Sequence, residues 1–176
     1  SSTIWPIGQA RLTPGLGRWL ISSTNSGRVC MGTRFTIDTS VFISRLTESE
    51  QTHEASRAFF EALPGRAVIV ILPALVAPEI GGAMSRLTGS ATVGHESLQL
   101  LDALPNLNLI PVDEQLAAEA AAIAVEGGMK GSDAVFVAVA QRFDAVLVSL
   151  DKAQRSRGPR SVRAASPEEA LEELEA

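Results

Sequence analysis

The sequence predicts an α/β protein whose mostly parallel central sheet is covered by helices on both faces. From residue 34 onward, short apolar segments alternate with longer segments of helical periodicity, as in βαβ units. The run from Ala67 to Leu72 is apolar throughout and rich in β-branched residues, which is typical of a strand buried on both faces. These observations together indicate a three-layer α/β/α sandwich.

The individual elements follow from local signals. Phe35-Thr36-Ile37 forms a first short strand that ends at Asp38, and Pro64-Gly65 and Gly127-Gly128 are helix stops. Ser166-Pro167-Glu168-Glu169 predicts a capping box that begins a terminal helix. Further strands are expected at 67–72, 107–112, 145–150 and near Val162. Helices are expected at 48–63, 74–87, 91–104, 113–126, 132–142 and 167–175.

The first thirty residues differ in composition from the rest of the chain. They are rich in Ser, Gly, Pro and Thr and show no sustained helical or strand period, whereas Met31 opens a stretch that looks like a natural start. We therefore predict that 1–30 is a leader or flexible extension, and that 31–176 is the functional domain.

Composition restricts the kinds of site that the chain can build. Hydrophobic residues make up 45% of the sequence and charged residues 20%, a globular balance. The single cysteine, Cys30, excludes an intrachain disulfide and a thiolate zinc cluster, and the two histidines are too scattered for a histidine-based one. The composition suits the reducing cytoplasm. No apolar run approaches the roughly 20 residues that span a bilayer, so we expect no membrane association.

The formal net charge of −5 bears on nucleic-acid binding. A protein that passively coats DNA or RNA normally has a basic surface, so this charge argues against that class. It remains compatible with an enzyme whose acidic residues hold cations.

Two aspartates follow predicted strands. Asp38 ends the first strand and Asp151 ends the strand Val148-Ser149-Leu150. Ligands of open α/β sheets bind beyond the carboxyl ends of the strands, so both residues are candidates for a site outside the deep core. The alternative for each is an ordinary helix-capping aspartate.

Two further acids lie in unusually apolar surroundings. Asp133 opens a helix whose remainder is almost wholly apolar, which would fix its N-terminus rigidly against the sheet; the alternative is an acid favoured only by the helix dipole. Glu79 lies in the otherwise uncharged stretch from Leu75 to Met84, where an unpaired buried charge would be costly. Carboxylates gathered at one edge of a sheet repel one another unless cations bind, and oxygen ligands select Mg²⁺ or Mn²⁺. Such ions support attack on a phosphodiester.

The acidic motifs resemble those of the PIN-domain nucleases, and among them the VapC-like toxins of bacterial type II toxin–antitoxin pairs. The resemblance runs from about Phe35 to Leu174. Its motifs are Ile37-Asp38-Thr39-Ser40-Val41-Phe42, Pro73-Ala74-Leu75-Val76-Ala77-Pro78-Glu79-Ile80, Gly131-Ser132-Asp133-Ala134 with the apolar residues that follow, and Leu147-Val148-Ser149-Leu150-Asp151-Lys152.

The resemblance implies an α/β/α fold and a set of catalytic, metal-binding acids carried onto Asp38, Glu79, Asp133 and Asp151. Ser40 matches the family's small hydroxyl residue after the first acid, and Ser149 matches a Ser or Thr position before the last one. Family members of this kind are usually Mg²⁺-dependent endoribonucleases, often homodimeric and silenced by a cognate antitoxin. The resemblance thus implies an RNA substrate and an antitoxin partner.

Lys152, Arg155 and Arg157 belong to the one local basic run of this acidic chain, which continues to Arg163. The run either guides the RNA backbone or is simply a solvated loop. Lys130 is more typical of a surface lysine than of a phosphate ligand.

Two other function classes compete with a ribonuclease. A PIN-like module could bind RNA or a protein partner without cutting, although the presence of all four acids argues against this. A phosphatase of the haloacid-dehalogenase type would carry Asp-x-Asp at the first strand, where this chain has Asp38-Thr39-Ser40.

Overall fold

The computed structural model describes residues 32–176, and the predicted leader therefore lies outside the part of the chain considered below. Five strands form one parallel sheet in the order β3-β2-β1-β4-β5. Their bounds are β1 Thr33–Ile37, β2 Val68–Pro73, β3 Leu107–Ile110, β4 Val146–Val148 and β5 Ala164–Ala165. The predicted three-layer α/β/α sandwich is confirmed, and its sheet is parallel throughout.

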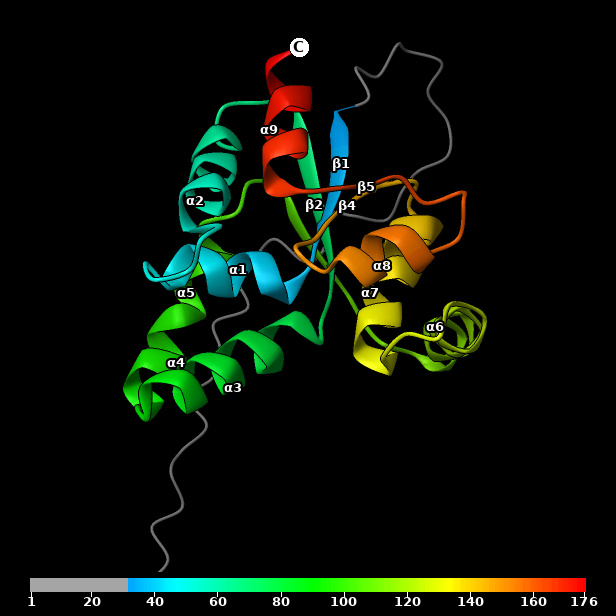
Figure 1. The fold of residues 1–176 in the computed structure, drawn as a ribbon, viewed down its shortest axis with the longest axis horizontal. Coiled ribbons are helices and arrows are strands. Elements are labelled where there is room, and N and C mark those ends of the chain that lie inside the picture. Colours follow the sequence, from blue (N-terminus) through cyan, green and yellow to red (C-terminus); the bar gives the residue numbers. More distant parts are fainter. Residues whose placement is uncertain (1–31) are drawn as a thin grey trace, which may run out of the picture. The chain divides into compact units, whose positions relative to one another are not determined.

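Helices cover both faces of this sheet (Figure 1). On one side lie α1 (Thr39–Leu46), α2 (His53–Ala62) and α9 (Pro167–Glu175), and on the other lie α6 (Glu114–Gly127), α7 (Gly131–Arg142) and α8 (Lys152–Arg157). The remaining helices, α3 (Val76–Thr88), α4 (Ala91–Ser97) and α5 (Gln99–Asp102), connect β2 to β3. None of the helices in this part of the chain is long and apolar enough to cross a membrane.

The core lies between the sheet and its two helical layers. Phe35 of β1 meets Phe59 of α2 edge to face, with ring centroids 5.5 Å apart. On the other face, α7 is buried from Ala134 to Ala140, as its nearly uniform apolar sequence requires. Its first turn is consequently held against the sheet.

The order in which strands are added to the sheet reverses at β1. Residues after β1 build β2 and β3 on one side of it, and the chain later returns to build β4 and β5 on the other side. The carboxyl ends of β1 and β4 are tied by a hydrogen bond from the Asp38 amide to the Val148 carbonyl, 2.9 Å long. In parallel sheets of this kind, such a switch in strand order leaves a crevice that commonly binds ligands.

Two helix predictions were wrong in detail, and two short helices, α1 and α8, were not predicted. The helix expected at 48–63 begins only at His53, because residues 47–53 form successive three-residue turns. Residues 39–46 form α1, which was missed because its β-branched, apolar sequence resembles an extension of β1. The helix expected at 91–104 is divided into α4 and α5 at Leu98, where three-residue turn bonds replace the α-helical pattern.

Candidate active site: an acidic cavity at the switch in strand order

Asp38 lies between β1 and α1 and is buried, with 7% of its surface exposed. It is the N-cap of α1, and its Oδ2 accepts a hydrogen bond from the Ser40 amide at 3.0 Å. The expectation that Asp38 would lie outside the core was therefore wrong. Buried carboxylates need hydrogen-bond donors, and the N-terminus of α1 supplies one.

Glu79 lies in the first turn of α3 and is half-buried. Its Oε2 accepts a 2.6 Å hydrogen bond from the hydroxyl of Thr39, the first residue of α1. This contact fixes Glu79 beside the residue that follows Asp38, although the two acids are far apart in the sequence.

Asp133 lies in the first turn of α7, where its Oδ1 accepts a 3.3 Å hydrogen bond from the Ser132 hydroxyl. Burial raises the pKa of Asp133, and the negative charges of Asp38 and Asp151 raise it further, although Lys130 acts in the opposite sense. The helix begins at Gly131, and Lys130 is its N-cap residue.

Asp151 is exposed and caps α8, a helix that the sequence did not predict. Its Oδ1 accepts hydrogen bonds from the amides of Ala153 at 2.6 Å and Gln154 at 3.2 Å. Its own amide donates to the Ser149 hydroxyl at 3.0 Å. The capping role expected as the alternative thus applies to both Asp38 and Asp151. Capping a helix does not exclude either residue from a ligand site.

All four acids line one cavity of about 310 Å³, hereafter the acid cavity. They come from four separate segments of the chain and meet where β1 and β4 end. Its other lining residues are Thr39, Ser40, Ala83, Arg86 and Lys130. Arg86 and Lys130 are exposed, so two cations border a cavity that is otherwise acidic.

The ligand atoms around the acid cavity suit a hard cation. Neither His nor Cys is among its lining residues, and oxygen-only ligands favour Mg²⁺ or Mn²⁺. Within residues 32–176, however, no three acidic, His or Cys side chains are arranged to hold a metal ion as they stand. The carboxylates instead accept the hydrogen bonds given above, so coordination of one ion by three of them would require side-chain rotation.

Gln154 of α8 connects the acids but was not recognised in the sequence. It is 2% exposed, and its Nε2 donates to Asp38 Oδ1 at 3.3 Å and to the Asp133 carbonyl at 3.0 Å. Both partners are acceptors, which fixes the orientation of the amide and leaves its buried Oε1 without a partner within the described chain. No local motif marks this residue.

Of the predicted substrate-binding residues, only Ser40 lines the acid cavity. Its hydroxyl accepts a hydrogen bond from the Leu150 amide. Ser149 is fully buried beneath Asp151. Three basic residues, Lys152, Arg155 and Arg157, lie on α8 outside the cavity lining.

Both arginines are engaged in contacts within the protein. Arg155 pairs with Glu169 at 3.4 Å, and Arg157 reaches the Gly128 carbonyl at 3.5 Å. The cations that line the acid cavity are Arg86, which no sequence motif marks, and Lys130, which was predicted to be a surface lysine.

The fold and the acid cavity define an α/β protein with a carboxylate-lined crevice at the switch point of a parallel sheet. The sequence profile of the PIN domain family matches residues 35–158. The chain therefore belongs to the PIN-domain family, the nuclease family that its acidic motifs resemble.

Solved structures share this fold at low sequence identity. The VapC20 toxin of Mycobacterium tuberculosis, described as cleaving the sarcin-ricin loop, is 17% identical over 74% of this chain and 99% of that chain, with a TM-score of 0.60. FitAcB of Neisseria gonorrhoeae is 21% identical over 77% of this chain and 98% of that chain, with a TM-score of 0.59. VapBC2 of Rickettsia felis, bound to a DNA fragment from its promoter, is 12% identical over 76% and 98%, with a TM-score of 0.56. No curated protein sequence matches the chain.

Proposed function

We propose that this chain is a Mg²⁺-dependent endoribonuclease that hydrolyses RNA phosphodiesters. The observation that carries the proposal is the meeting of Asp38, Glu79, Asp133 and Asp151 around one cavity at the switch in strand order. Membership of the PIN-domain family supports the same chemistry.

The four carboxylates would hold one or two Mg²⁺ ions, or Mn²⁺ in their place. A bound ion of this kind supplies Lewis-acid activation of the phosphodiester and of water. Arg86 and Lys130, at the border of the acid cavity, would attract and orient the RNA phosphate. Thr39 bonds to Glu79 and Gln154 bonds to Asp38, and these contacts hold both carboxylates at the acid cavity, where a side-chain rotation would bring them to an ion.

Cleavage of RNA by the purified protein tests the proposal directly. We expect Mg²⁺-dependent internal cuts that are lost in Asp38→Asn and Asp133→Asn and retained in Asp102→Asn, which neutralises an exposed acid outside the cavity. If the first two variants cut as fast as the unmodified protein, the acid cavity is not the active site.

A second candidate is a PIN-like module that binds RNA or a protein without cutting. The observation in its favour is that the carboxylates are not yet arranged to hold an ion. Calorimetric titration with Mg²⁺ separates the two: the nuclease binds the ion through Asp38 and Asp133, whereas the module shows no binding that these substitutions remove.

We further propose that the chain acts in the cytoplasm as the toxin of a toxin–antitoxin pair. Structural neighbours described as a toxin–antitoxin complex from Klebsiella pneumoniae and as VapBC2 support this assignment. We expect the product of an adjacent reading frame to co-purify with the chain and to suppress cleavage. Light scattering of the purified chain tests the expected homodimer.

A further inference from the structure

A second cavity opens beside the acid cavity. It encloses about 510 Å³ and shares Thr39, Ser40 and Asp151 with its neighbour. Its remaining lining residues are Ile43, Ser44, Glu50, Thr52 and Leu150. Because the two cavities adjoin at these residues, an RNA whose phosphate occupied the acid cavity has room for a neighbouring nucleoside in the second cavity.

The two cavities differ in the charged side chains that line them, and so they suit different parts of a nucleotide. The acid cavity combines its four acids with Arg86 and Lys130, whereas the second cavity, within residues 32–176, is lined by two acids and by no Lys or Arg. The second cavity therefore offers a phosphate no cationic side chain. Ile43 and Leu150 instead offer aliphatic surface beside hydroxyl and carboxylate oxygens. Such a mixture suits a nucleobase, which has apolar faces and a polar edge.

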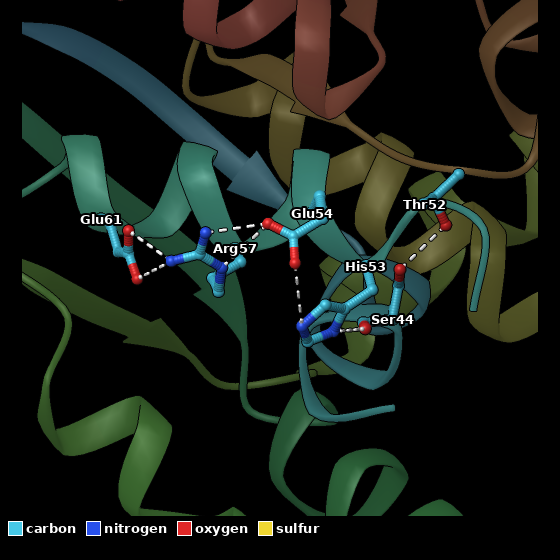
Figure 2. A network of polar contacts seen from close by, with 6 residues as sticks. All are labelled: Ser44, Thr52, His53, Glu54, Arg57 and Glu61. Carbon is cyan, nitrogen blue, oxygen red and sulfur yellow. Dashed lines mark hydrogen bonds and ion pairs between the residues drawn. The ribbon is translucent and has the colours of Figure 1, made fainter. Parts of the chain in front are cut away.

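Most of the polar side-chain atoms that line the second cavity are oxygens that can accept hydrogen bonds. The hydroxyls of buried Ser44 and of Thr52 bond to each other at 2.8 Å, so one of their two hydrogens is already used (Figure 2). His53, beside this pair, is turned to the Ser44 carbonyl at 3.0 Å, which fixes the junction of α1 and α2. Glu50, an exposed residue in the loop between these helices, contributes a carboxylate whose two oxygens accept hydrogen bonds.

We infer that the second cavity is a nucleobase subsite, next to the cleaved phosphate, that prefers guanine; this inference rests on the proposed ribonuclease function. Guanine presents adjacent N1–H and N2–H donors, which match the two oxygens of one carboxylate. Uracil offers a single N–H between two carbonyl oxygens, which the Glu50 carboxylate repels. Ile43 and Leu150 contact the face of the base.

The first test is a set of oligoribonucleotides that differ in one base beside the cut bond. We expect kcat/KM to favour guanine over uracil by about tenfold or more, the factor that one charge-assisted hydrogen bond supplies. Glu50→Gln should reduce this ratio to about threefold or less, because the amide keeps the shape but loses one acceptor. Glu48→Gln, which alters a neighbouring exposed acid outside the cavity, should leave the ratio unchanged.

A second measurement does not depend on cleavage. Nuclear magnetic resonance titration with guanosine 5′-monophosphate should shift the amides of Ser44 and Thr52, and uridine 5′-monophosphate should shift them less. Ile43→Ala should weaken the guanosine shifts without unfolding the protein.

The outcomes separate this inference from the proposed function. Cleavage without base preference, or a preference that Glu50→Gln leaves intact, overturns the subsite and leaves the ribonuclease standing. Absence of RNA cleavage together with guanosine-selective shifts overturns the ribonuclease and supports a base-binding pocket. If neither nucleotide shifts these amides, or if only a co-purifying protein does so, the nucleobase subsite is wrong.

Discussion

Replacing Gln154 by leucine should separate the stability of the fold from the metal affinity of the acid cavity. The amide of Gln154 holds the Asp38 carboxylate and the Asp133 carbonyl at the same time, from a position that is 2% exposed. Leucine has nearly the same size and can occupy the buried space, but it donates no hydrogen bond.

The expected cost in stability follows from the three polar contacts that change. Loss of the bond to the Asp38 carboxylate costs about 1.5–3 kcal/mol, and loss of the bond to the Asp133 carbonyl costs about 0.5–1.5 kcal/mol. Removal of the unpartnered Oε1 returns about 1–3 kcal/mol, because a buried unsatisfied acceptor destabilises the folded state. The central values leave a net loss of about 1 kcal/mol in the free energy of unfolding.

Gln154→Leu should also weaken the binding of metal ions at the acid cavity. Side chains that orient metal ligands typically contribute a factor of about 10–100 in affinity, and Gln154 holds one proposed ligand directly and the backbone of another. We therefore expect Gln154→Leu to weaken Mg²⁺ and Mn²⁺ binding by about tenfold or more.

Urea denaturation in EDTA measures the first quantity, and calorimetric titration with Mg²⁺ and Mn²⁺ measures the second. Gln115→Leu is the matched control, because Gln115 is exposed and contacts only Glu119 among the hydrogen bonds found in residues 32–176. A loss of more than about 4 kcal/mol would refute the reasoning by exceeding the balance above. Unchanged metal affinity would show that Gln154 does not position the proposed ligands.

Three further predictions concern the fold around the site. In EDTA at pH 7.5, Asp133→Asn should be more stable than the unmodified protein, because the raised pKa of Asp133 means that its ionisation opposes folding. In urea titrations this advantage should shrink as the pH falls below the raised pKa and should be absent once the pH is below the ordinary pKa of aspartate. Ser166→Ala should lower the unfolding free energy by about 1 kcal/mol, because it removes the capping box with Glu169; an unchanged urea midpoint would contradict this. Gly94→Ala should cost about 1–3 kcal/mol, because a Cβ there would lie 2.8 Å from the Gly81 carbonyl oxygen, and a thermal melt equal to that of the parent would disprove the close packing of α3 and α4.

The positions of the acids along the strands and helices could be predicted from local sequence. The side-chain hydrogen bonds that hold the acids could not. Asp38 and Asp151 follow apolar strands, and parallel strands bring their carboxyl ends to one edge of a sheet. The contact between Thr39 and Glu79 joins residues 40 positions apart, and that between Gln154 and Asp38 joins residues 116 apart. No period or motif encodes such pairs, because they arise only when α1, α3 and α8 are packed together.

The two short helices α1 and α8 could not be predicted from hydrophobic periodicity. The six residues of α8 and the eight of α1 are too few to show a helical period, and each helix is initiated by the aspartate before it. Without these helices, Asp38 and Asp151 had two competing interpretations, as caps or as site residues. The structure shows that the two interpretations are compatible, because both capping aspartates also line the acid cavity.

This double role determines which substitutions can test the site. Alanine at position 38 or 151 would remove a helix cap as well as a charge, and the lost cap alone costs about 1 kcal/mol and would shift Ser40 or Gln154. Asparagine caps helices about as well as aspartate, so it removes the charge and retains the cap. Asp38→Asn and Asp151→Asn should therefore fold with α1 and α8 intact while losing Mg²⁺ affinity. Loss of both properties together in the asparagine variants would mean that the charge itself, rather than the cap, holds this edge of the sheet together.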